Sequence, residues 1–207
     1  IVSDVTTLDF DGDSITDYFF VSDVGGRIWR FDINTLNHGR HDFANAGVIF
    51  DANAAKGEQD SYKRFYYAPS ISYFRDEEKN DEYLSVAIGS GFRAHPLAPT
   101  SHDHFFVLKE RNLVKAPEKY VTLTPDDLIS LNSHDSFSDV AGQSGVSDSL
   151  LNNGWKVELE VGEKVLSKAL TSQGDVYFTT FSPTVKASNP GSCIADVGTS
   201  FAYTLDI

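Results

Sequence analysis

Short apolar runs separated by turn-forming residues give the chain a β-type pattern. Residues 18–21 and 28–33 predict two strands joined by a tight turn, where Gly25 and Gly26 supply the positive φ angles. On the second strand Trp29, Phe31 and Ile33 recur at a period of two and therefore share one face. Similar patterns predict strands at residues 1–8, 47–50, 82–89, 104–109, 155–159, 163–170, 175–181 and 200–207, and two short strands around Pro69 within residues 64–74.

Two short helices are also predicted. Thr124 is a helix-capping residue, Pro125 suits the first helical position, and the acids that follow suit the first turn. This pattern predicts a helix from Thr124 to about Leu131. A second short helix is predicted around residues 147–152.

A unit of two strands recurs three times. Each copy has an acidic residue, an apolar strand, a connection that contains Gly and an aromatic-rich strand. The copies begin at Asp17, Glu82 and Asp175, farther apart than ordinary propeller blades of about 40–50 residues, because insertions lengthen the connections. The sequence therefore predicts an all-β fold, either a modified β-propeller or a fragment of one, with long insertions and one or two short helices. A β-sandwich is the alternative architecture.

The stretch before the first strand pair carries candidate metal chemistry. Asp9, Asp11, Asp13 and Asp17 occupy relative positions 1, 3, 5 and 9, and Ile15 at position 7 can add its carbonyl oxygen. Alternate Asp side chains in a tight loop fold their oxygens inward, an arrangement that suits a hard cation such as Ca²⁺. Four carboxylates this close would repel one another without a positive charge between them. The alternative is a polar Asp-rich turn without an ion.

The loop matches an EF-hand only in part. Position 6, where that loop needs Gly, is Ser14, and position 12, where it has a bidentate Glu, is Phe20. The residues after the loop predict a strand instead of a helix. The sequence therefore predicts a calcium-type loop that leads into a β-hairpin.

Composition and charge exclude some classes of protein. The chain has 207 residues, enough for one large domain or part of a bigger protein. Its net charge of −13, from 17 basic and 30 acidic residues, argues against nucleic acid as a partner and fits calcium binding and an extracellular surface. No apolar stretch is long enough to span a bilayer, so no membrane insertion is expected.

The start of the chain and its single cysteine add two expectations. The absence of Met and the start at Ile1 predict a processed chain or a fragment, whose signal peptide could have been lost with a missing N-terminus. If the protein is secreted, the lone Cys193 can pair with a residue outside this chain.

From Asp9 to Ile33 the sequence resembles the C-terminal β-propeller of the PilC/PilY family, large proteins at the tip of bacterial type IV pili. The resemblance rests on the Asp-rich loop followed by residues 18–32. It continues in order at residues 87–93, 162–167 and 176–183, and in the closing segment from Cys193 to residue 206. The family's loop more often has Gly at the position of Ser14.

This resemblance implies a fold, a metal site and a biological role. Residues 1–207 would form a partial C-terminal propeller domain with further blades upstream. Ca²⁺ would bind Asp9, Asp11, Asp13, the Ile15 carbonyl and Asp17. The role would be pilus assembly, balance between pilus extension and retraction, and adhesion at the outer cell surface, without catalysis. Minor pilins of the pilus tip complex would be partners, together with a ligand on a host or abiotic surface.

Other residues suggest weaker candidates. The run His102-Asp103-His104 has ligands that suit a transition metal, although solvated His side chains in a loop explain it as well. Ser90 lies between two glycines but lacks the helix pattern that follows a nucleophile elbow. Trp29 and Trp155 can stack on a sugar, and their apolar strands favour a place in the core instead. The alternative function is a propeller outside the pilus system that acts as a quinoprotein-type enzyme or a carbohydrate-binding module.

Overall fold

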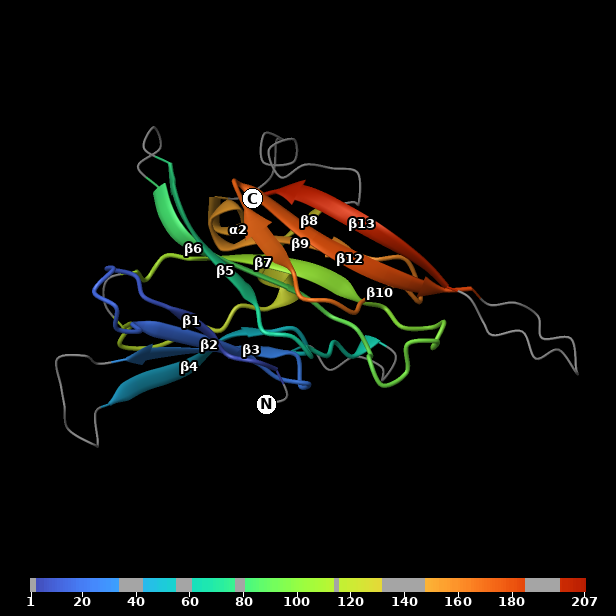
Figure 1. The fold of residues 1–207 in the computed structure, drawn as a ribbon, viewed down its shortest axis with the longest axis horizontal. Coiled ribbons are helices and arrows are strands. Elements are labelled where there is room, and N and C mark those ends of the chain that lie inside the picture. The colour runs from blue at the N-terminus through green and yellow to red at the C-terminus, as the bar shows by residue number, and fades with distance from the viewer. Residues whose placement is uncertain are drawn as a thin grey trace, which may run out of the picture.

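Three β-sheets lie side by side in the structure, a computed structural model that describes residues 3–33, 43–54, 61–76, 81–113, 116–131, 148–184 and 198–207 (Figure 1). Sheet A has the order β1-β2-β3-β4, with β1 (Thr6–Leu8), β2 (Tyr18–Ser22), β3 (Arg27–Ile33) and β4 (Ala44–Asp51). Sheet B has the order β5-β6-β7-β9-β8, with β5 (Ser70–Asp76), β6 (Asp81–Gly89), β7 (His104–Glu110), β8 (Ile129–Leu131) and β9 (Gly154–Glu158).

Sheet C contains the last four strands. They are β10 (Lys164–Val165), β11 (Leu170–Ser172), β12 (Asp175–Pro183) and β13 (Gly198–Asp206). β13 pairs with β12 over its whole length, and the short strands β10 and β11 share the other edge of β12. All neighbouring strands in the three sheets are antiparallel except β8 and β9. Cys193 lies outside the described residues.

One edge strand from each sheet lies beside the others, as the inner strands of propeller blades do: β1 of sheet A, β5 of sheet B and β11 of sheet C. β5 contacts both β1 and β11. Thr6 Oγ1 donates to Pro69 O at 2.7 Å, and Thr171 N donates to Ser70 Oγ at 3.2 Å. The predicted repeat corresponds to the hairpin pairs β2–β3, β6–β7 and β12–β13, one in each sheet. The prediction of an all-β, propeller-like fragment is therefore confirmed.

Sheet B is buried on both faces. On β6, Leu84, Val86 and Ile88 pack toward sheet A, whereas Ala87 packs toward sheet C. β7 alternates in the same way: Phe106 packs toward sheet A, and its two neighbours on the strand pack toward sheet C. Each core therefore lies between two adjacent sheets, which is how the blades of a propeller pack.

A close approach joins sheets B and C at the end of β6. A Cβ on Gly89 would lie 2.4 Å from the side chain of Val165 on β10, so only Gly fits there. Ser90 O accepts a hydrogen bond from Val165 N at 3.0 Å. The break that Gly89 makes in the sequence pattern therefore marks contact between two sheets.

The predicted helix at Thr124 is mostly wrong. Only Pro125–Asp127 is helical, as one 3₁₀ turn with the predicted Thr124 cap. Residues 129–131 form β8, which pairs in parallel with β9 and buries Ile129 and Leu131. Tertiary burial of these apolar side chains outweighs the local helix signal. Helix α2 (Asp148–Asn153) agrees with the second prediction.

Residues 64–74 also differ from prediction in one respect. Only one strand forms there, β5, which begins immediately after Pro69. The residues before Pro69 have no regular structure. Proline has no N–H to donate to a strand ladder, so it marks the start of β5.

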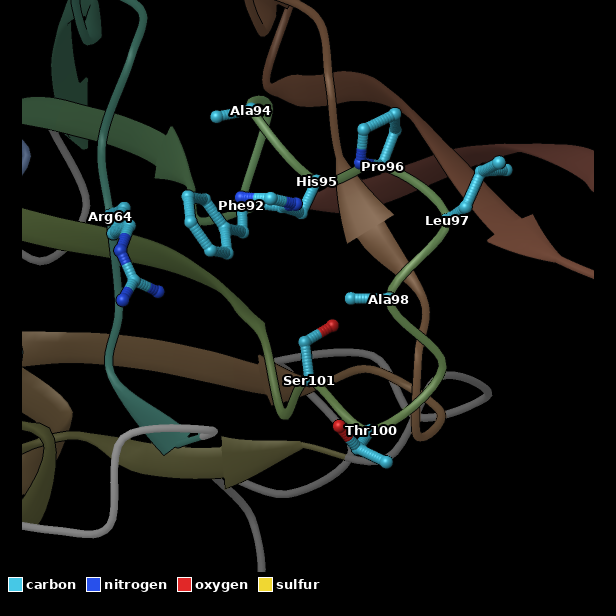
Figure 2. A pocket seen from close by; sticks show the side chains of 9 residues that line it. All are labelled: Arg64, Phe92, Ala94, His95, Pro96, Leu97, Ala98, Thr100 and Ser101. Carbon is cyan, nitrogen blue, oxygen red and sulfur yellow. The ribbon is translucent and has the colours of Figure 1, made fainter.

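The long connection between β6 and β7 frames a pocket of about 440 Å³ (Figure 2). Arg64 lines one side, and residues from Phe92 to Ser101 line the rest. Turns closed by His95 N to Phe92 O at 3.0 Å and by Ala98 N to His95 O at 3.1 Å shape this connection. The insertion predicted between residues 92 and 103 is thus an ordered wall.

Phe105→Ala is expected to lower the free energy of unfolding by about 3–5 kcal/mol, because it leaves a cavity between sheets B and C. Phe105 is fully buried, and its ring centroid lies 3.8 Å from that of Phe178. Phe201→Ala is the matched control, since Phe201 is 46% exposed, and a loss below about 1 kcal/mol is expected there. Urea unfolding measures both. Equal losses would contradict the two-core description.

Candidate cation site

The predicted cation loop connects β1 to β2. Backbone hydrogen bonds close it at both ends: Asp17 N donates to Leu8 O at 2.9 Å, and Ile33 N donates to Asp17 O at 2.7 Å. The second bond comes from the end of β3. The last residue of the loop is therefore tied to the hairpin β2–β3.

The fold brings three of the four predicted carboxylates together. Asp9, Asp11 and Asp17 each offer an oxygen, and these oxygens lie within 4.8 Å of one another. Asp9 and Asp11 are exposed, and Asp17 is half-buried. Carboxylate oxygens are ligands that Ca²⁺ prefers, and three negative charges this close repel one another unless a cation lies between them. The donor set therefore fits a hard divalent cation.

Backbone N–H groups of the loop hold the carboxylates in position. Asp9 accepts a hydrogen bond on each oxygen, from Gly12 N at 2.7 Å and from Ser14 N at 2.8 Å. Asp17 Oδ2 accepts one from Phe10 N at 2.7 Å. These bonds fix the orientation of the carboxylates before any ion arrives, which lowers the entropy cost of binding.

Ser14 adopts the backbone conformation that Gly usually supplies at its position. Its φ is 70°, and that of Gly12 is 79°. A non-glycine residue in this region is strained. The departure from Gly therefore leaves the turn intact, at a cost in backbone strain.

Asp13 and the Ile15 carbonyl are the remaining predicted ligands. Asp13 is not one of the three gathered carboxylates, and its Oδ1 accepts a hydrogen bond from Ile15 N at 2.7 Å. The assignment of Asp13 and the Ile15 carbonyl as ligands stays a prediction.

Tyr18, the residue after the loop, leads into a buried group of charges. Arg30 is fully buried, and its Cζ lies 4.7 Å from the Tyr18 ring centroid. Arg30 pairs with Asp32 at 2.5 Å and with Glu110 of sheet B at 3.3 Å. Tyr120 Oη donates to the other oxygen of Asp32 at 2.5 Å. Because this charge cluster draws on both sheets, it fixes sheet A against sheet B next to the loop.

The charge cluster was not among the sequence predictions, although β3 carries a signal for it. One face of β3 carries Ile28, Arg30 and Asp32, and the other carries Trp29 and its apolar neighbours. The structure buries the face that carries the charges. Trp29 is half-buried on the opposite face, so its predicted place in the core is wrong. Trp155 is fully buried, as predicted.

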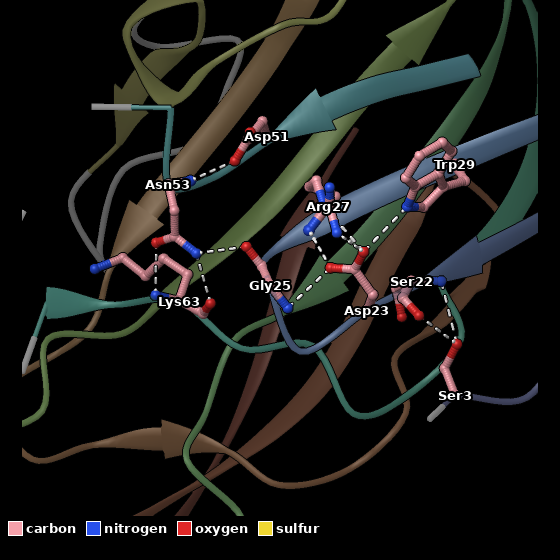
Figure 3. Close-up of polar contacts among 9 residues, drawn as sticks. All are labelled: Ser3, Ser22, Asp23, Gly25, Arg27, Trp29, Asp51, Asn53 and Lys63. Atoms are coloured by element: carbon pink, nitrogen blue, oxygen red, sulfur yellow. Dashed lines mark hydrogen bonds and ion pairs between the residues drawn. The ribbon is translucent and has the colours of Figure 1, made fainter. Parts of the chain in front are cut away.

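A second polar network holds the turn of the β2–β3 hairpin (Figure 3). Asp23 accepts hydrogen bonds from Gly25 N at 2.9 Å, Arg27 Nε at 3.0 Å and Trp29 Nε1 at 3.1 Å. Burial alone would raise the pKa of Asp23, but the bonds from Trp29 and Arg27 together lower it. The ionised carboxylate therefore stabilises the turn.

Only one of the two predicted turn glycines has a positive φ. Gly26 has a φ of 80°, and a Cβ there would lie 2.3 Å from Asn53 Nδ2. Asn53 Nδ2 donates to Gly25 O and to Lys63 O, both at 2.8 Å (Figure 3). Gly26 is therefore needed for its conformation and for the close approach of Asn53.

The other candidate residues hold structural positions. In the described part of the chain, the three loop aspartates form the only group of three or more possible metal ligands, so His102, Asp103 and His104 do not converge on one site there. Ser90 is fully buried, and its hydroxyl donates to Asp103 at 2.7 Å and accepts from His104 N at 3.0 Å. Ser90 thus ties two segments of sheet B together.

Comparison with known proteins supports the fold. The sequence matches no protein-family model and has no significant match among curated proteins. The structure is similar to the crystal structure of the C-terminal domain of PilY1 from Pseudomonas aeruginosa, with a TM-score of 0.62 and 17% sequence identity. The alignment covers 98% of this chain and 46% of that chain, so this chain spans about half the length of the PilY1 domain. At this identity the likeness establishes the fold alone.

No helix within the described ranges is long and apolar enough to cross a membrane.

Acid is expected to destabilise the protein through His104. Burial, followed by the charges of Lys63 and Lys156, lowers its pKa from 6.5 to about 3. The unfolded state therefore binds one more proton than the folded state between these values, and stability is lost as pH falls from about 6.5 toward 3, by at most about 1.4 kcal/mol per pH unit.

Urea unfolding of the wild type and of His104→Gln across this pH range checks the expectation. The difference in unfolding free energy between the two proteins should shrink on acidification, because the variant lacks the titrating group. A difference that stays constant with pH would show that His104 titrates normally in the folded protein.

Proposed function

We propose that this chain is a calcium-binding part of the β-propeller of a type IV pilus tip or biogenesis protein. One observation carries the proposal: on a fold similar to the PilY1 C-terminal domain, Asp9, Asp11 and Asp17 converge in one loop. One fold can host many functions, so the fold alone does not define the function. The chain would act by binding and positioning, without catalysis.

The ion would be held by carboxylate oxygens of Asp9, Asp11 and Asp17, with Asp13 and the Ile15 carbonyl as further predicted ligands. When bound, it supplies the positive charge that offsets the mutual repulsion of the carboxylates. Ca²⁺ accepts an irregular shell of six to eight oxygens, whereas Mg²⁺ demands a tighter octahedron. An exposed loop with only part of an EF-hand pattern favours Ca²⁺.

Ion binding at the loop can affect the rest of sheet A. Asp17 receives a hydrogen bond from Ile33 N, and the next residue, Tyr18, pairs with Asp32 on β3. Asp32 in turn pairs with the buried Arg30. Ordering of the loop by an ion therefore favours the hairpin β2–β3 and its contact with sheet B.

The proposed setting is the outer surface of a bacterium, at the pilus tip. Minor pilins would be the partners, and a host or abiotic surface would supply any adhesion ligand. The outer face of sheet A, where Phe19 and Phe31 stack at 4.3 Å and remain half-buried, supports further blades of a larger propeller. The proposed role is to support assembly and to balance pilus extension against retraction.

Asp11→Asn and Asp17→Asn are expected to weaken Ca²⁺ binding by about tenfold or more, because each removes one anionic ligand. Asp11 and Asp17 each accept loop hydrogen bonds on a single oxygen. The amide oxygen of an Asn side chain can accept the same bonds. The variants thus remove charge while they keep the loop shape. Titration calorimetry with Ca²⁺ and with Mg²⁺ measures the effect.

Asp4→Asn is the matched control. Asp4 is exposed and lies outside the loop. Its substitution therefore changes the net charge by the same amount without removing a ligand. Calcium affinity close to the wild-type value is expected for this variant. If all three variants bind calcium like the wild type, the site assignment is wrong. Equal weakening in all three would indicate attraction by net charge alone.

Bacteria that carry Asp17→Asn in the full-length protein are expected to show reduced surface piliation or altered twitching, because the empty loop would permit premature retraction. Normal protein level and an empty site must be verified first. Pilus counts and motility at low and high external calcium are the measurements. Wild-type behaviour in both media would leave a structural ion as the only role of the loop.

A further inference from the structure

The pocket beside the β6–β7 connection differs in charge from the rest of the chain. The protein has 30 acidic side chains among 207 residues, yet residues 61–75 and 83–102 contain none. These two stretches supply every residue that lines the pocket (Figure 2). In a protein with a net charge of −13, such a wall carries no negative charge of its own, and Asp103 beside Ser101 is the acidic group next to it.

Arg64 lines this pocket without a carboxylate partner among the described residues. Its Cζ lies 4.0 Å from the ring centroid of Phe92, and Nη1 donates to Tyr62 O at 3.1 Å. The stacking holds the planar group in one orientation, while its other N–H groups keep their capacity to donate. A guanidinium held in this way is suited to a bidentate contact with a carboxylate.

A second polar group faces the pocket from the other side. Ser101 is 8% exposed, and its hydroxyl has no hydrogen-bond partner in the described structure. Burial raises the pKa of Asp103, and contacts that include the Ser101 hydroxyl act to lower it, so this hydroxyl lies close to the Asp103 carboxylate. In Figure 2 Arg64 and the Ser101 hydroxyl lie on opposite sides of the pocket. A buried hydroxyl without a partner gains stability when a ligand supplies one.

The pocket wall is held in place by bonds to β10 of sheet C and to the turn before it. Lys164 Nζ donates to Ala98 O at 2.6 Å, and Gly162 N donates to Ser101 O at 2.7 Å. Between these anchors the wall is apolar and includes Pro96 and Leu97. A preformed apolar pocket with a few convergent polar groups is typical of small-ligand sites.

We propose that this pocket binds an organic carboxylate with an apolar or aromatic body. The carboxylate pairs with Arg64, the body packs against Phe92, Pro96 and Leu97, and the Ser101 hydroxyl can donate to a polar group at the other end of the ligand. The volume of about 440 Å³ lies within the range of small-molecule pockets. The site is separate from the cation loop and does not depend on the proposed function.

Two sources can supply this chemistry, and three probes distinguish them. N-acetyl-phenylalanine imitates the C-terminal residue of a peptide, 3-phenylpropionate imitates a free acid, and N-acetyl-phenylalanine amide lacks the charge. We expect both acids to bind with a Kd on the order of millimolar, as suits ligands of their size. The amide should bind at least about tenfold more weakly. Tighter binding of N-acetyl-phenylalanine than of 3-phenylpropionate would indicate a peptide C-terminus.

NMR titration of the whole chain, followed by amide shifts at residues 91–101, measures these affinities. Arg64→Gln should weaken the acids by about tenfold or more and leave the amide unchanged. Leu97→Glu places a negative charge at the pocket, where Leu97 is 50% exposed, without altering Arg64. Leu170→Glu is its matched control, because Leu170 is 61% exposed on sheet C and does not line the pocket.

Three results would overturn the proposal. The first is the absence of shifts at residues 91–101 with either acid at concentrations well above a millimolar. The second is equal binding of the acids and the amide. The third is acid binding that neither Arg64→Gln nor Leu97→Glu weakens relative to Leu170→Glu. Leu97→Glu keeps the test valid even if Arg64→Gln disturbs the packing of Phe92.

Discussion

A sheet with two apolar faces must be covered on both sides, and this constraint organises the whole structure. In β6 and β7 of sheet B consecutive residues are buried in different cores, so water is excluded from both faces. Sheets A and C supply the two covers. The stacking of three sheets with neighbouring edge strands β1, β5 and β11 follows from this requirement. That arrangement places the β1–β2 loop and the β6–β7 connection at the surface.

The buried charge of Arg30 restricts how sheet A can pack on sheet B. An uncompensated guanidinium in a core costs several kcal/mol, about 3–5 when one partner of a buried pair is removed. Arg30 is compensated by Asp32 on its own strand and by Glu110 across the sheet boundary. A shift of the two sheets would separate Arg30 from Glu110. The pair therefore restricts sheets A and B to arrangements that keep Arg30 beside Glu110.

The local pattern of residues was enough to predict most strands and all three hairpin pairs, because period-two alternation and turn glycines are encoded within a few residues. It failed where distant residues decide the outcome. Ile129 forms a strand because β9 lies beside it, and Trp29 is displaced from the core by a charge that Glu110 compensates 80 residues later. Within the cation loop the spacing anticipated the convergence of three aspartates, but not that Asp13 would stay apart.

The net negative charge of the protein favours cation binding at the loop and opposes anion binding at the pocket. At the loop, the carboxylates and the net charge of −13 both raise the local concentration of cations. At the pocket, the same net charge repels an anion over a Debye length of about 8 Å at physiological salt, and only nearby groups such as Arg64 oppose it. Salt therefore weakens long-range attraction at the loop, whereas at the pocket it screens long-range repulsion and leaves the short contact with Arg64. The absence of acidic side chains from the pocket wall would limit this repulsion at the proposed anion site.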